Sequence, residues 1–121
     1  SDEINWCAGF VNYCLEQAGF IGNEHPGARS VFWNRRNQFV RLDQPAYGAI
    51  AVLRDLPFGD PNWETGTGHV GFIVDSDENG LILLGGNQSG TVQRSHYKLP
   101  MTTQQGTVTR RLEAIMMPRM N

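Results

Sequence analysis

The sequence predicts an α+β domain, because one helical segment comes first and a series of strands follows it. Residues 5–18 carry apolar side chains at intervals of three and four, the pattern of a helix with one buried face. From residue 48 onward apolar and polar residues alternate, and Asp-Glu-Asn-Gly at 77–80 is a hairpin turn signal between two such runs. A helix followed by antiparallel strands is typical of α+β folds.

The first helix is expected to begin after Asn5, a good N-cap residue, and to end at Gly19. A second, short helix is expected over residues 28–34, after a Pro-Gly turn. The expected strands cover residues 48–53, 69–75, 81–84, 91–97 and 112–117. We therefore predict an N-terminal helix packed on an antiparallel sheet of about five strands.

Length and charge limit the possible functions. A chain of 121 residues fits one domain, residues 1–121, and its net charge of −2 gives no electrostatic basis for binding nucleic acid. No apolar run approaches the roughly 20 residues of a membrane span. The start, Ser-Asp-Glu, has no apolar signal segment, so we expect export by a non-Sec route or release by lysis.

The two cysteines lie on the predicted helix in different positions. Cys7 falls near the second helical residue, where free N–H groups and the helix dipole favour a thiolate. Cys14 lies mid-helix on the apolar stripe, which indicates a core residue. Seven residues correspond to about 10 Å of helix, too far for a disulfide between them. Cys7 is therefore the candidate nucleophile, and a small buried apolar residue is the alternative interpretation.

A candidate base opens the strand at residues 69–75. Alternation places His69 on one face with Gly71, while Val70 and Phe72 point to the other. Because Gly71 has no side chain, we expect the N-terminus of the helix to approach there and bring Cys7 within reach of His69. The alternative is a histidine exposed to water at the edge of a strand. His25 and His96 are expected at the surface.

A base needs a partner that fixes its tautomer, and Asn87 follows the next apolar strand. Its side-chain carbonyl can accept a hydrogen bond from an imidazole, although Asn-Gln-Ser-Gly is also good turn composition. Asp75 and Gln88 are the rival partners. Asp75 lies about 20 Å along the strand from His69. No Cys/His cluster has the spacing of a zinc site, so neither a metal nor a cofactor is expected.

Four short segments together resemble the NlpC and CHAP families of papain-like peptidases. They are Asn5-Trp6-Cys7-Ala8-Gly9-Phe10-Val11-Asn12, Ala28-Arg29-Ser30, Gly68-His69-Val70-Gly71-Phe72 and Leu84-Gly85-Gly86-Asn87-Gln88-Ser89. The resemblance covers roughly residues 5–97 and implies a papain-like fold that hydrolyses amide bonds of peptidoglycan. It assigns the nucleophile to Cys7, the base to His69 and the orienting partner to Asn87.

Substrate contacts are expected from residues near these three. They are Trp6, Gly71, Gln88 and Trp63, the last in a long loop over residues 54–68 that we expect to form a groove wall. Only six residues precede Cys7, fewer than in the families that the chain resembles. Either the domain is minimal or an upstream piece has been removed.

The resemblance also implies context and partners. A catalytic domain of this kind resembles a phage lysin core or an amidase effector delivered by a type VI secretion system, acting on the cell wall of a target or lysed cell. Its partners would be peptidoglycan peptides and, for an effector, an immunity protein that occludes the site. The alternatives are a protein deamidase or transpeptidase with the same residues, or a wall-binding module without activity.

Overall fold

The chain folds as one helix followed by seven strands, in the ranges that the structure describes. The structure is a computed structural model that describes residues 2–19, 39–56, 68–86 and 91–119, with only the backbone of residues 2–6 and 8. The elements are α1 (Asp2–Gln17), β1 (Phe39–Leu42), β2 (Ile50–Asp55), β3 (Gly68–Asp77), β4 (Gly80–Gly86), β5 (Val92–Lys98), β6 (Met101–Thr102) and β7 (Val108–Pro118). The predicted α+β class is therefore confirmed, and the expected helix at 28–34 lies outside the described residues.

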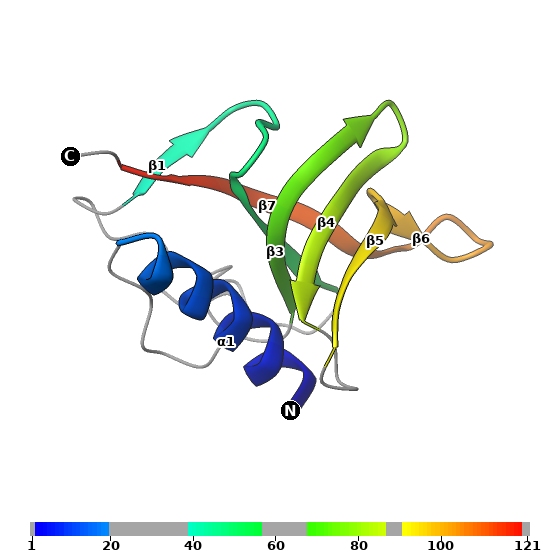
Figure 1. Cartoon of the computed structure of the whole chain (residues 1–121). Coiled ribbons are helices and arrows are strands. Elements are labelled where there is room, and N and C mark those ends of the chain that lie inside the picture. The colour runs from blue at the N-terminus through cyan, green and yellow to red at the C-terminus, as the bar shows by residue number, and fades with distance from the viewer. Residues whose placement is uncertain (1, 20–38, 57–67, 87–90, 120–121) are drawn as a thin grey trace.

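The strands form one antiparallel sheet in the order β1-β7-β2-β3-β4-β5, with β6 paired to β7. Strand β7 is the longest and pairs with β1, β2 and β6 along its length. The prediction of about five strands missed β1 and β6, which have four and two residues and are too short to show a clear alternation. The twisted sheet wraps so that β3 and β4 cross β7 steeply (Figure 1).

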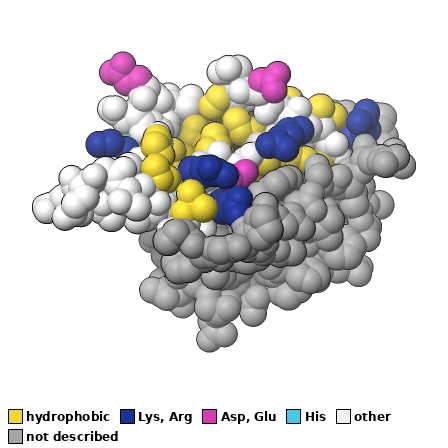
Figure 2. Space-filling view, turned by 180° about the vertical axis from the view of Figure 1, so that it is seen from behind, with side chains coloured by type: hydrophobic (Ala, Val, Ile, Leu, Met, Phe, Trp, Pro, Cys, Tyr) yellow, Lys and Arg dark blue, Asp and Glu magenta, His cyan; other side chains and the backbone are white. Residues whose placement is uncertain are grey.

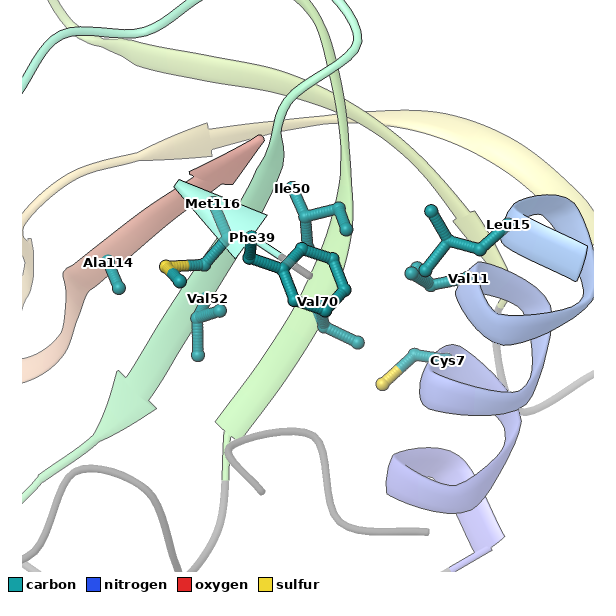
Figure 3. Packing of buried hydrophobic residues seen from close by; sticks show 9 residues of the cluster. All are labelled: Cys7, Val11, Leu15, Phe39, Ile50, Val52, Val70, Ala114 and Met116. Carbon is teal, nitrogen blue, oxygen red and sulfur yellow. The ribbon is translucent and has the colours of Figure 1, made fainter. Parts of the chain in front are cut away.

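The sheet buries apolar side chains on both faces. On one face α1 packs against β3 and β4, as Figure 1 shows. The helix-side cluster, drawn in Figure 3, consists of Cys7, Val11, Leu15, Phe39, Ile50, Val52, Val70, Ala114 and Met116. The far-side cluster on the opposite face consists of Ala49, Ala51, Leu53, Ile73, Leu81, Leu83 and Ile115. The buried apolar side chains of β2, β3 and β7 therefore belong to one of two separate layers.

The predicted hairpin turn joins β3 to β4. Strand β3 ends at Asp77 and β4 begins at Gly80, and the backbone N–H of Asn79 donates a 2.8 Å hydrogen bond to Oδ1 of Asp77. Gly80 has φ of +156°, and a Cβ there would overlap the backbone oxygen of Tyr97 on β5. The glycine is required because the neighbouring strand passes too close for any side chain.

Candidate active site

Helix α1 begins earlier than the sequence indicated. It starts at Asp2, so Cys7 is its sixth residue instead of its second, and Asn5 lies inside the helix. Only the first four N–H groups of a helix lack an intrahelical acceptor. The prediction that a helix N-terminus stabilises a thiolate at Cys7 is therefore wrong. The acidic Asp2 and Glu3 favour the first turn of a helix, which explains the earlier start.

Cys7 lies at the interface between α1 and the sheet. Its side chain is completely buried, and it shares the helix-side cluster with Val11 and Leu15, which follow at steps of four residues. Figure 3 shows its sulfur directed from the helix toward the sheet, near Val70 of β3. The predicted apolar stripe of the helix is thus confirmed in its central members, and it presents the thiol to the Gly68 end of β3.

Cys14 has a different environment from Cys7. Neither cysteine forms a disulfide, as the sequence predicted, but Cys14 is only half-buried. Burial raises the pKa of the Cys14 thiol, which therefore stays protonated at neutral pH. The expectation that Cys14 belongs to the core is met only in part, because the helix turns this residue toward the rim of the interface.

His69 is the second residue of β3 and is nearly buried, with 6% of its surface exposed. Its ring stacks on Tyr97 of β5, with ring centroids 5.2 Å apart and planes inclined by 29°. It also lies over Gly85 of β4, where an added Cβ would be 3.7 Å from Nε2 of His69. The alternative of a water-exposed strand-edge histidine is therefore excluded.

The helix covers the face of β3 opposite to the one expected. Val70 and Phe72 face α1, and the Phe72 ring makes an edge contact with Phe10 at 6.3 Å between centroids. A Cβ on Gly71 would lie 3.2 Å from Cβ of Leu83, a far-side residue. The predicted alternation along β3 is confirmed, but the prediction that Gly71 makes room for the helix is wrong. Gly71 is buried and makes room for Leu83.

Burial, together with a nearby positive charge, keeps His69 neutral. Its pKa is lowered from 6.5 to about 4, first because burial penalises the imidazolium and then because the Arg110 guanidinium repels it. The carboxylate of Asp55 acts in the opposite direction, and it forms an ion pair with Arg110. At pH 7 the imidazole is therefore neutral, the form that a general base needs, but a pKa this far below 7 makes it a weak base in this environment.

The two proposed catalytic groups lie at the same end of β3 but in different layers. Cys7 clusters with Val70 on the helix side, whereas its chain neighbour His69 contacts Tyr97 and Gly85 on the far side. Proton transfer between thiol and imidazole requires the two groups within about 3 Å of each other or joined by one water. The assignment of Cys7 and His69 as a catalytic pair stays a prediction.

Other predicted site residues fall largely outside the described residues. Asn87, Gln88 and Trp63 lie there, and Trp6 is described by its backbone alone. Asp75 is exposed near the other end of β3, where Oδ1 accepts a 2.8 Å hydrogen bond from the N–H of Ser76. The assignment of Asn87 as orienting partner and of these residues to substrate binding stays a prediction. His96 is exposed and lies 3.3 Å from Asp77, as expected of a surface residue.

The sequence did not indicate two sets of contacts near this end of the sheet. One is the stacking of Tyr97 on His69. The other is an ion-pair cluster of Arg54, Arg111 and Glu113. Arg110 pairs with Asp55, and Arg111 pairs with Glu113. Alternation along β2 places Arg54 on the helix side, but its partner is 59 residues away and no sequence pattern joins them.

Among the described residues, one cavity lies away from Cys7, and no group of side chains could hold a metal ion. A cavity of about 550 Å³ opens beside the β3–β4 turn, with apolar walls that include Leu81, Leu99 and Leu112 of the far-side layer and its fringe. It is away from Cys7 and is not the space in which Cys7 would react. Within the described ranges, no three His, Cys, Asp or Glu side chains group closely enough to hold a metal ion.

Comparison with known families assigns the chain to one of them. The CHAP domain family matches residues 1–87, a range that includes Cys7, His69 and Asn87, and the chain belongs to this family. No curated protein and no solved structure matches the chain. Membership suggests a peptidoglycan hydrolase or amidase that acts on the cell wall. In the part of the chain described, no helix has the length and hydropathy needed to cross a bilayer.

Proposed function

We propose that the chain is a cysteine amidase that hydrolyses amide bonds in the peptides of peptidoglycan, with a papain-like arrangement of its active site. The observation that carries the proposal is the family match over residues 1–87, which contains the cysteine and histidine motifs in the expected order. The fold supports it, because α1 presents Cys7 to the end of β3 at which His69 lies.

In the proposed reaction, the Cys7 thiolate attacks the carbonyl carbon of the amide, after its proton has passed to His69. The tetrahedral intermediate collapses, the C–N bond breaks, and His69 gives the proton to the leaving amine. Water then attacks the thioester while His69 removes its proton, which releases the carboxylic acid and restores the thiol. Asn87 would hold the imidazole in the required orientation.

This chemistry needs the Cys7 thiol and the His69 imidazole within hydrogen-bond reach in the complex with substrate. Catalytic hydrogen bonds are often long before substrate binds and shorten in the complex.

The experiment incubates purified sacculi with the wild-type protein and with Cys7→Ala, His69→Gln and Cys14→Ala. Soluble muropeptides are then separated and identified by mass spectrometry. We expect release by the wild type and Cys14→Ala, and a loss of at least about 100-fold in rate for the other two variants. Equal release by the wild type and Cys7→Ala would refute the assignment of Cys7 as the nucleophile.

The same spectra identify the bond that is cut. New amino and carboxyl termini would support an amidase, whereas no released fragment together with retained peptide binding would indicate a wall-binding module. Delivery of the protein as a lysin or effector stays a prediction. The existence of an immunity protein that binds it stays a prediction as well.

A further inference from the structure

The stack of His69 on Tyr97 joins two strands that are not neighbours in the sheet. His69 lies on β3 and Tyr97 on β5, and β4 lies between these two strands. The ring centroids are nevertheless 5.2 Å apart, within the range of about 4.5–7 Å in which aromatic rings attract each other, and the planes are inclined by 29°. The two side chains therefore meet across the far face of β4, independently of the strand pairing.

Tyr97 has a fixed place in the far-side layer. Its backbone pairs with Leu81 of β4, which is almost completely buried, and its side chain packs against the far-side cluster. A tyrosine side chain has only two rotatable torsions, so packing of this kind holds the ring in one orientation at little entropic cost. The imidazole of His69 thus rests on a ring that is itself held in place.

The stack leaves the edge of the imidazole open. A stacked ring covers a face of its partner, whereas the N–H bond and the lone pair of the two ring nitrogens lie in the ring plane. At the edge that carries Nε2 of His69, Gly85 of β4 has no side chain, and an added Cβ would lie 3.7 Å from this nitrogen. Tyr97 can therefore fix the plane of the imidazole without occupying a nitrogen that exchanges a proton.

The charged groups that act on His69 have a different effect. Leu53 pairs with His69, and Asp55 follows two residues later on the same face of β2. The Asp55 carboxylate forms an ion pair with Arg110 of β7, and the two charges act on the imidazolium in opposite directions. Seen from behind, basic side chains gather around an acidic one among hydrophobic side chains (Figure 2). These charges change how readily His69 takes a proton, whereas the contact of Tyr97 with the ring face defines its plane.

We propose that Tyr97 is a positioning residue for His69, whose ring holds the imidazole plane by stacking and leaves the ring nitrogens free to exchange a proton. The inference rests on the proposed function, because it takes His69 as the general base. A base that is already oriented needs less ordering to reach the transition state, so the effect falls on the chemical step. The stack requires an aromatic ring, which phenylalanine also supplies.

The kinetic test compares Tyr97→Leu, which removes the ring, with Tyr97→Phe, which keeps it. The substrates are soluble muropeptides, prepared from sacculi with a muramidase. We expect Tyr97→Leu to lower kcat about tenfold while KM stays within about twofold of the wild type, because the lost contact acts on the base and not on the substrate. Tyr97→Phe should retain kcat within about threefold of the wild type.

Tyr47→Leu is the matched control, because Tyr47 is 78% exposed and lies beside Ser76, toward the other end of β3 from His69. It makes the same substitution and should leave kcat and KM unchanged. Urea unfolding confirms that each variant is folded under the assay conditions. Tyr97→Met, which also lacks an aromatic ring, takes the place of Tyr97→Leu if the leucine variant does not fold.

NMR spectroscopy tests the stack without any turnover. The imidazole C–H signals of His69, assigned by their loss in His69→Gln, should be displaced by the tyrosine ring current in the wild type. They should keep this displacement in Tyr97→Phe and lose it in Tyr97→Leu, which a general loss of stability would not reproduce.

Two results would overturn the positioning role. One is a wild-type kcat in Tyr97→Leu, and the other is an equal loss of kcat in Tyr97→Leu and Tyr97→Phe. The proposed function fails separately, when sacculi release the same muropeptides with the wild type and Cys7→Ala. The imidazole signals then still decide whether Tyr97 orients His69.

Discussion

Neighbouring residues of β3 pack on opposite faces of the sheet, in two different buried layers. Val70 packs under α1 in the layer of Cys7, while His69 packs against Tyr97 in the layer of Leu83. Both faces are buried, and both contain residues of the histidine motif. The comparison teaches that a sequence motif can bring two reactive groups to one end of a strand without placing them in one layer.

The largest expected effect is on the pH dependence of stability. It tests whether His69 packs in the far-side layer. Its lowered pKa means that the folded state binds fewer protons than the unfolded state between pH 6.5 and about 4. Its stabilising contribution is therefore complete above pH 6.5 and is lost as pH falls to about 4. Over this range the wild type should lose roughly 3 kcal/mol more than His69→Gln, measured by urea unfolding.

His96→Gln is the control, because His96 is exposed, and it should leave the pH dependence nearly unchanged. The sign of the His69 effect distinguishes the two layers. A histidine paired with a Cys7 thiolate would have a raised pKa, and its contribution would be lost as pH rises. A steeper loss of stability at alkaline pH in the wild type than in His69→Gln would therefore contradict the far-side position.

A smaller effect tests which face Gly71 opens. Gly71→Ala should destabilise the protein by about 1–3 kcal/mol, because the new Cβ lies 3.2 Å from Cβ of Leu83 and from the backbone oxygen of Leu84. In the Leu83→Gly background, which lacks this Cβ, the cost of Gly71→Ala should fall by about 0.5 kcal/mol or more. The double-mutant cycle is measured by chemical denaturation.

Gly9→Ala is the matched control on α1, where a Cβ meets nothing within 4 Å. It should stabilise the helix by about 0.5–1 kcal/mol, the usual gain of alanine over glycine. If Gly71→Ala and Leu83→Gly were strictly additive, the two residues would not share the far-side layer.

The smallest expected effect is that of removing the Cys14 thiol. Cys14→Ala should change the free energy of unfolding by less than about 1 kcal/mol, because Cys14 is half-buried at the edge of the interface. Activity on sacculi should be retained, since burial keeps this thiol protonated. Thermal unfolding and muropeptide release measure the two parts. A folded but inactive Cys14→Ala would identify the wrong cysteine as nucleophile.

Local chemistry made much of the fold predictable. The interval of three and four along α1 predicted the helix and its buried face, although the acidic residues at 2 and 3 extended it beyond the expected start. The turn at 77–80 and the alternation along β3 were also predicted correctly. The short strands β1 and β6 were missed because they depend on pairing with β7, a contact between residues far apart in the sequence.

For the candidate site, the sequence by itself determined that Val70 and His69 point in opposite directions, because side chains alternate along any strand. It also singled out Cys7, in the range that matches the CHAP family. Only the tertiary structure decided which face of β3 the helix covers. Both faces of the strand carry apolar residues, so alternation is equally compatible with either choice, and the packing of Leu83 over Gly71 leaves the Val70 face for α1.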